Sequence, residues 1–232
     1  MGPPRRAFQP SRHGFPFPNS WPPAPGVLVP SPIGRIGIGN AARGLCGGMV
    51  FAALDYWHAG RPPPASRPAP GSPLYKFIVR RLIDSWHVPA GVGRYYLWMN
   101  LPDADASREA GGWRLTVRGL GWRTVTRQWP LVRASIDAGT PAALGVITMA
   151  SAWPGVLGRN HQVLAYGYSI SGSTVTLAVY DPNSGPDDHV QIAFDTGDAA
   201  GPVTFRQNLS IAWPVRGFFV TAYSAAAPPV TD

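Results

Sequence analysis

The sequence contains very little cysteine, lysine or glutamate: each occurs once, at Cys46, Lys76 and Glu109. A single cysteine excludes an intramolecular disulfide, so side-chain packing has to hold the fold together. No stretch approaches the roughly 18 apolar residues of a membrane span, and prolines and polar residues follow Arg5 and Arg6 where a secretion signal would be apolar. We therefore expect a soluble protein with no membrane span and no signal peptide, either cytoplasmic or exported by a signal-independent route.

Arginine supplies nearly all of the positive charge, and the formal net charge is +8. The arginines are spread in ones and twos from Arg5 to Arg216, and they do not form the basic stripe, interleaved with aromatic residues, that a nucleic-acid groove requires. We therefore expect no nucleic-acid partner. Histidine, cysteine and carboxylate residues show no metal-ligand spacing, so the sequence predicts neither a metal nor a cofactor.

Hydrophobic residues make up 45% of the 232-residue chain, which is enough to bury the core of one domain. Residues 1–32 are dense in proline, and this density predicts an extended or disordered arm. Four aromatic residues in the arm have rings that can pack against the domain or a partner: Phe8, Phe15, Phe17 and Trp21. We expect the domain to cover residues 33–224 and a tail to follow at 225–232.

The first half of the chain has helical periodicity. Apolar residues at helical spacing predict one helix from about Gly47 to His58 and a second over residues 74–86. The stretch from Trp113 to Thr126 mixes β-branched residues with glycines and predicts one or two short strands. A short helix is expected over residues 130–139.

The second half changes to runs rich in β-branched and aromatic residues, which predict strands. The dipeptide Ser171-Gly172 joins two of these runs as a hairpin turn would. Helices followed by an antiparallel sheet predict the α+β class.

Cys46 stands where a glycine-containing loop ends and the first expected helix begins. The unpaired amides of a first helical turn, together with the helix dipole, stabilise a thiolate at such a position. Gly47 and Gly48 follow directly, and they predict a backbone that a substrate can approach. The alternative is that Cys46 is a small buried hydrophobic residue.

His161 is the only one of the five histidines that begins an apolar strand, where its ring can be held rigidly beside the helix of Cys46. Asp181 follows the strand that the hairpin turn pairs with that of His161. His161 lies ten residues before Ser171 (171 − 161) and Asp181 nine residues after Gly172 (181 − 172), so antiparallel pairing places both at one end of the ribbon. Asp181 is therefore a candidate to orient the imidazole. The alternatives are a structural histidine and a turn carboxylate.

A tetrahedral intermediate also needs hydrogen-bond donors for its oxyanion, each of which lowers the barrier by roughly 3 to 4 kcal/mol. The Cys46 amide is one candidate. The side chain of Asn40, six positions before the cysteine (46 − 40), is the other, unless Asn40 is only a turn residue.

Three segments, NAARGLCGGM, HQVLAYGY and VYDPN, together resemble papain-like cysteine peptidases, especially the bacteriocin-processing, double-glycine peptidase-like group. The chain order Cys, His, Asp is theirs. Papain-like enzymes carry an amide side chain, usually glutamine, six residues before the nucleophile, which is the position of Asn40. An aspartate as third member, here Asp181 before Pro182, is typical of the bacteriocin-processing group. The resemblance spans roughly residues 33–223.

This resemblance implies a papain-like α+β fold with the nucleophile in a helical first part and an antiparallel sheet after it. It also implies a cysteine peptidase or amidase that acts on a peptide or protein, a toxin-like effector being one interpretation. Cys46 would attack the carbonyl, His161 would move the proton, and water would release the product from a thioester. Trp57, Trp153 and the loop 151–160 are candidates to border the cleft.

Two other interpretations remain open. A transamidase would share the triad and differ in the acceptor. A catalytically inactive papain-like module would instead bind a peptide or partner protein through its cleft and arm.

Overall fold

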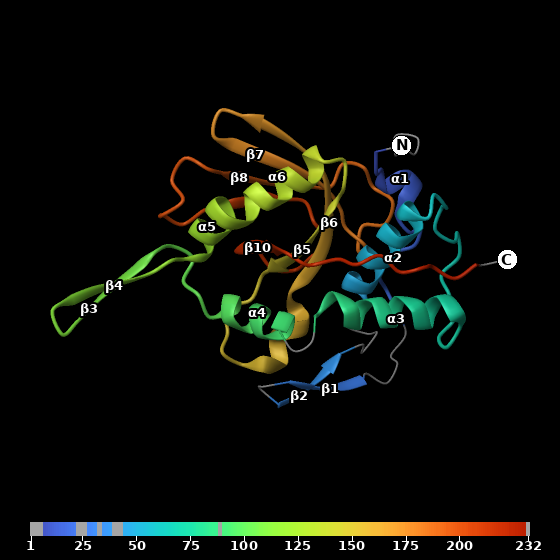
Figure 1. The fold of residues 1–232 in the computed structure, drawn as a ribbon, viewed down its shortest axis with the longest axis horizontal. Helices are drawn as coiled ribbons and strands as arrows, with labels where there is room; N and C mark the ends of the chain where they lie inside the picture. The colour runs from blue at the N-terminus through green and yellow to red at the C-terminus, as the bar shows by residue number, and fades with distance from the viewer. Residues whose placement is uncertain (1–6, 22–26, 32–33, 39–43, 88–89, 231–232) are drawn as a thin grey trace.

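A computed structural model describes residues 7–21, 27–31, 34–38, 44–87 and 90–230. The main feature of the fold is an antiparallel sheet with helices packed on both faces (Figure 1). Its strands run in the order β10-β5-β6-β7-β8-β9. They are β5 (Ala142–Ile147), β6 (His161–Ser171), β7 (Thr174–Tyr180), β8 (Gln191–Asp195), β9 (Phe205–Gln207) and β10 (Gly217–Val220). The α+β class predicted from the sequence is confirmed.

Two hydrophobic cores lie on opposite faces of this sheet, because successive residues of a strand point to opposite sides. Leu164 and Tyr180 belong to the first core, whereas Val163 and Val179 belong to the second. The first core contains residues of α2 (Cys46–His58), α3 (Pro73–Ser85) and α4 (Ala90–Met99). The second contains residues of the π-helical turn η2 (Thr124–Gln128) and α6 (Trp129–Asp137), which follow the short α5 (Leu120–Arg123).

Residues 7–21 supply four aromatic side chains to the first core, so this described part of the arm, which we expected to be extended or disordered over residues 1–32, packs against the domain. Phe8, Phe15, Phe17 and Trp21 are all buried, and Phe15 packs edge-on against Tyr56 of α2. The prolines limit helix to the short α1 (Pro10–His13), with a proline at its first position, but they do not prevent aromatic rings from packing.

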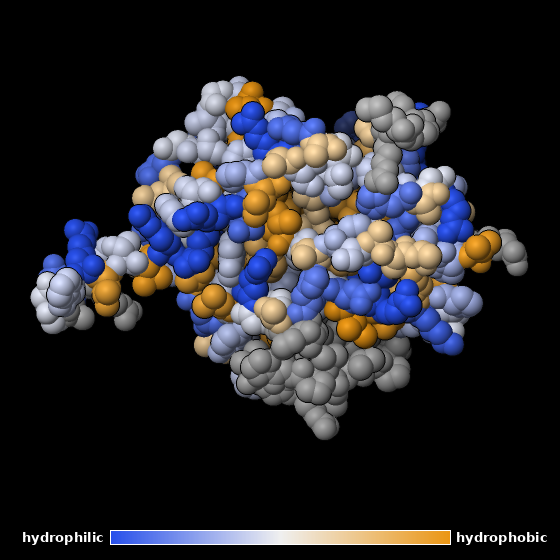
Figure 2. Space-filling model, viewed as in Figure 1, coloured by the Kyte–Doolittle hydropathy of each residue, from blue (hydrophilic) through white to orange (hydrophobic). Residues whose placement is uncertain are grey.

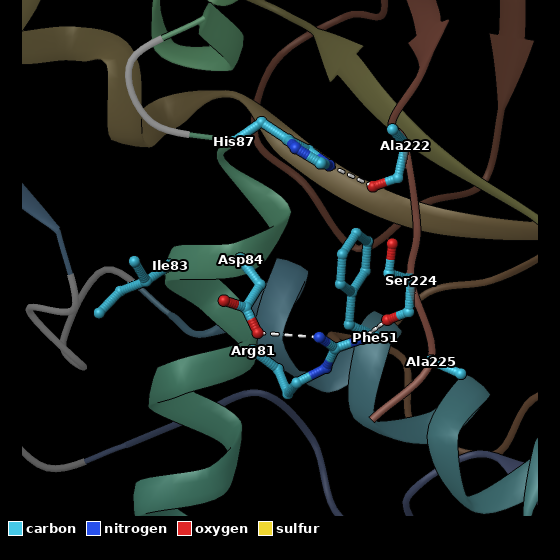
Figure 3. A pocket seen from close by; sticks show the side chains of 8 residues that line it. All are labelled: Phe51, Arg81, Ile83, Asp84, His87, Ala222, Ser224 and Ala225. Atoms are coloured by element: carbon cyan, nitrogen blue, oxygen red, sulfur yellow. Dashed lines mark hydrogen bonds and ion pairs between the residues drawn. The ribbon is translucent and has the colours of Figure 1, made fainter. Parts of the chain in front are cut away.

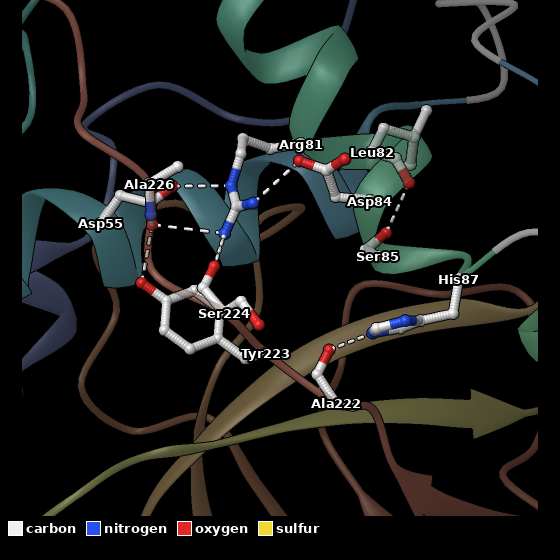
Figure 4. A network of polar contacts seen from close by, with 10 residues as sticks. All are labelled: Asp55, Arg81, Leu82, Asp84, Ser85, His87, Ala222, Tyr223, Ser224 and Ala226. Carbon is white, nitrogen blue, oxygen red and sulfur yellow. Dashed lines mark hydrogen bonds and ion pairs between the residues drawn. The ribbon is translucent and has the colours of Figure 1, made fainter.

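The expected tail at 225–232 is also attached to the domain in its described part. Figure 4 shows the charge network that fixes it. Asp55 of α2 and Arg81 of α3 form an ion pair of 2.7 Å with side chains 0% and 4% exposed. The Tyr223 hydroxyl (2.6 Å) and the Ala226 amide (2.9 Å) donate to Asp55, and Arg81 donates to the Ser224 carbonyl (2.8 Å).

Two hairpins stand outside the sheet. The first pairs β1 (Val27–Ser31) with β2 (Gly34–Ile38), and Pro30 is tolerated because each strand of a two-stranded ribbon is an edge. The second pairs β3 (Ala106–Ala110) with β4 (Trp113–Val117) and projects from the body at the left of Figure 1. Hydrophilic and hydrophobic side chains are mixed on this projection (Figure 2), where Trp113 is 77% exposed.

The expected strands over residues 113–126 end at Val117. Gly119 follows in an extended conformation and a helical segment begins at Leu120. Within the ranges described above, no helix combines the length and the apolar character needed to cross a bilayer.

Candidate active site

Cys46 is the first residue of α2 and is partly exposed. The preceding residue, Leu45, is fully buried and fixes the start of the helix, since its carbonyl accepts from the Met49 amide at 2.9 Å. Leu45 has no polar side chain to cap the helix. Leu45 therefore does not cap the first-turn amides beside the thiol. An oxyanion site requires such uncapped amides as donors.

Gly47 and Gly48 let neighbouring elements pack closely against the first turn of α2. A Cβ on Gly48 would lie 2.1 Å from the Ile78 carbonyl oxygen of α3. A Cβ on Gly47 would lie 2.3 Å from the Ser85 hydroxyl and 2.5 Å from the Gln162 amide oxygen. The glycines let α3 and the sheet approach the first turn of α2, because no side chain larger than hydrogen fits there.

His161 and Asp181 meet as the sequence predicted. His161 begins β6 and Asp181 directly follows β7, and the distance from His161 Nε2 to Asp181 Oδ1 is 2.7 Å. Both are buried, at 5% and 0% exposure. The His161 ring also interacts with the Cys46 side chain, which raises the pKa of the imidazole. Nε2 faces the carboxylate, so Nδ1 is the ring nitrogen left for the thiol.

A β-bulge sets the face on which Asp181 lies. From the turn inward, Ser171 pairs with Thr174 and Gly167 with Ala178, but the register then shifts so that Leu164 pairs with Tyr180. The residue after Tyr180 is thus opposite Val163, on the same face as His161. Without the extra residue it would lie opposite Leu164, on the other face, because a one-residue slip reverses every side chain.

Asp181 is held ionised by four donors. Besides His161, its carboxylate accepts from the Asn183 amide (2.9 Å), the Ser210 amide (2.8 Å) and the Ser184 hydroxyl (3.3 Å). Burial raises the pKa of Asp181, but the charge of His161 and these hydrogen bonds outweigh it and lower the pKa overall.

The ring of His161 favours the protonated form for a related reason. Burial lowers its pKa, whereas the charge of Asp181, the charge of Cys46 and the hydrogen bonds to both raise it, and the result is about 10. The imidazolium, paired with the Asp181 carboxylate, is therefore the form of His161 that this site favours at neutral pH.

Asn160, which sequence reasoning missed, positions the strand start that carries His161. Its buried amide oxygen accepts from the Thr148 amide (3.1 Å), and its amide nitrogen donates to the Leu157 carbonyl (3.0 Å). These bonds tie the end of β5 to η3 (Pro154–Arg159) immediately before β6. A polar residue directly before an apolar strand was the only available signal.

The remaining sequence candidates are Asn40, Trp57 and Trp153. Asn40 lies outside the described residues. Trp57 is buried, its ring in edge contact with Phe8, and it lines a cavity of about 470 Å³ whose lining does not include Cys46. Trp153 is 70% exposed at the start of the loop before His161.

A cavity of about 450 Å³ lies elsewhere, between α3 and the residues after β10 (Figure 3). Its charged side chains already have partners: Arg81 contacts Asp84 at 2.8 Å, and the His87 ring contacts the Ala222 carbonyl. This cavity lies where the residues after β10 pack against α3, and its lining does not include Cys46.

No three histidine, cysteine or carboxylate side chains gather as a metal-binding group in the described part of the chain. The geometry around Cys46 is instead that of a thiol, an imidazole and a carboxylate in series. No model of a known protein family matches this sequence, and comparisons with curated proteins and with solved structures found no match.

Proposed function

We propose that the protein is a cysteine hydrolase, a peptidase or amidase with a papain-like arrangement of its site. The observation that carries this proposal is the buried 2.7 Å contact between His161 and Asp181 on a ring that also interacts with Cys46. A nucleophile, a base and a residue that orients the base are the groups that acyl transfer needs. The position of Cys46 at the start of α2 supports it further, since first-turn amides can donate to an oxyanion.

The chemistry follows from the positions of these groups. The Cys46 thiolate attacks the carbonyl carbon, and the oxyanion develops beside the first-turn amides of α2. His161 gives its proton to the leaving amine as the C–N bond breaks, which leaves a thioester on Cys46. The neutral ring then takes a proton from water as the water attacks the thioester, and the acid product leaves. Asp181 holds the ring orientation throughout.

The test is the rate of Cys46 alkylation by iodoacetamide between pH 4 and 9 in the wild type and in His161→Ala. We expect the wild type to react well below pH 7, because the imidazolium stabilises the thiolate. At pH 6 His161→Ala should react about tenfold more slowly, since a free thiol is nearly all protonated there.

His189→Ala is the matched control, because His189 is exposed and follows the acidic pair Asp187-Asp188 in a loop. It should react as the wild type does. If the wild type reacts only near the pKa of a free thiol, or does not react, the hydrolase proposal fails. The binding module would then be the better interpretation.

A further inference from the structure

The segment before the first large helix contacts both halves of the candidate site through one side chain, Asn19. Its amide oxygen accepts from the Leu45 amide at 2.6 Å, immediately before Cys46. Its amide nitrogen donates to the Asn183 side-chain oxygen at 2.9 Å. The backbone of Asn19 adds a third contact, because its amide donates to the Pro182 carbonyl at 2.9 Å.

These bonds are part of a closed ring of contacts around the candidate site. Asn183, which accepts from Asn19, donates its own backbone amide to Asp181 Oδ1 at 2.9 Å. The same oxygen faces His161 Nε2, and the His161 ring also interacts with Cys46. The path therefore leads from the residue before the nucleophile, through Asn19, to the carboxylate and back to the nucleophile.

The backbone around Asn19 is shaped to its side chain. Gly44 has a φ of +84°, and a Cβ there would lie 2.5 Å from the Asn19 amide nitrogen. The Trp21 indole N–H donates to the Asn19 oxygen at 2.9 Å, and the Trp21 ring is buried against Tyr75. Donor and acceptor of the amide are thus assigned without ambiguity, since its oxygen faces two N–H groups and its nitrogen faces a carboxamide oxygen.

We propose that Asn19 is a positioning residue, which sets the separation of Cys46 from the His161–Asp181 pair by bridging the residue before Cys46 to the turn after Asp181. The proposal rests on the proposed function. Asn19 acts through Leu45 and Asn183 and does not contact the reacting atoms.

The experiment measures iodoacetamide alkylation of Cys46 against pH in Asn19→Ala, Asn19→Asp and Trp21→Phe. Asn19→Ala removes both side-chain bonds. Asn19→Asp keeps an acceptor for Leu45 and Trp21 but has no donor for Asn183, so it breaks the bridge with little change in shape. Trp21→Phe is the matched control, because it weakens the same segment and leaves the bridge to Leu45 and Asn183 in place.

We expect both Asn19 variants to lose about tenfold in rate at pH 6 and to react at pH 9 as the wild type does, because a misplaced pair no longer stabilises the thiolate. Trp21→Phe should lower the melting temperature and keep the wild-type pH profile. If Asn19→Ala does not fold, Asn19→Asp carries the test alone.

Two results would overturn the proposal while the hydrolase survives. One is a wild-type profile in Asn19→Asp, and the other is an equal loss at pH 6 in Trp21→Phe, which would show a merely structural role. Failure of the hydrolase itself looks different, because the wild type would then lack the reaction below pH 7.

Discussion

Helix α2 is held at its start by neutral amides and near its end by buried charges. At the start, Asn19 bridges Leu45 and Asn183. Near the end, the carboxylate of Asp55 and the guanidinium of Arg81 lie side by side with almost no exposure. The first group lies beside the thiol, whereas the second fastens residues 223–226 to the helix.

The two ends of α2 differ in how much stability their polar contacts contribute and in what the loss of those contacts affects. A neutral hydrogen bond contributes about 0.5 to 1.5 kcal/mol net, so several can be lost before a domain unfolds. Removing one partner of a buried ion pair costs roughly 3 to 5 kcal/mol, because the other charge stays buried without compensation. Damage near Asp55 should therefore reduce stability, and damage near Asn19 should mainly reduce thiol reactivity.

The largest effect is expected from Arg81→Met, which leaves Asp55 buried without its cation. We expect the free energy of unfolding to fall by about 3 to 5 kcal/mol, measured by urea denaturation with tryptophan fluorescence. The folded fraction should keep the wild-type alkylation rate at pH 6. Arg80→Met, at an exposed position of the same helix, is the control and should cost well under half as much. Equal losses in the two variants would contradict the contrast between the ends.

The pH dependence of stability tests the charged part of the site. The pKa of His161 is about 10 in the fold, compared with about 6.5 in the unfolded chain. Between these values the folded state holds a proton that the unfolded state lacks, so the contribution of His161 is complete below pH 6.5 and is lost as the pH rises through 10. Relative to His161→Gln, the wild type should lose stability on the order of a few kcal/mol across this window. A constant difference in the free energy of unfolding between the wild type and His161→Gln from pH 6 to 10 would refute this prediction.

Tyr223→Phe removes one hydrogen bond from the charged end without opening a cavity. The lost bond joins the hydroxyl to Asp55 Oδ1 at 2.6 Å, and the Phe ring can still pack edge-on against Phe51. We expect a loss of about 1.5 kcal/mol in urea denaturation, as is typical for a bond to a charged group. A loss as large as that of Arg81→Met would mean that the hydroxyl, and not the ion pair, dominates this end.

Ser184→Ala should have the smallest effect. Its hydroxyl is the most distant of the donors to Asp181, at 3.3 Å, and the two backbone amides and His161 remain. We expect a stability change within about 0.5 kcal/mol and an unchanged alkylation profile. A changed profile would show that Asp181 needs every donor. Ser184 would then affect thiol reactivity as Asn19 is expected to.

Local patterns predicted the elements that carry the candidate site. The helix at Cys46 and the hairpin through Ser171-Gly172 each depend on residues close in sequence, so periodicity and turn chemistry were sufficient. Counting along the hairpin brought His161 and Asp181 to one end of it. The shift between Ala165 and Gly167 was not predictable, because this stretch has the pattern of an uninterrupted strand.

Other parts depend on contacts between distant segments. Helix α4 contains Gly91 and Gly93, which lower helix propensity, and burial of Tyr95 and Trp98 compensates for them. The bridge made by Asn19 joins residues 164 positions apart, and no local pattern marks it. For the same reason the sequence indicated that the aromatic rings of residues 1–32 can pack against the domain or a partner, but it did not show which of the two buries them.

The order of synthesis gives the attachment of residues 223–226 a further consequence. Asp55 is made 171 positions before Ala226, its backbone donor, and Asn19 is made 164 positions before Asn183. During synthesis on the ribosome, α2 therefore stays incompletely buried until most of the sheet has emerged. Contacts of such long range also slow folding. During that interval Cys46 is present without His161. Under the proposed function, a nascent chain thus carries the thiol without its base until the strands that supply His161 and Asp181 are added.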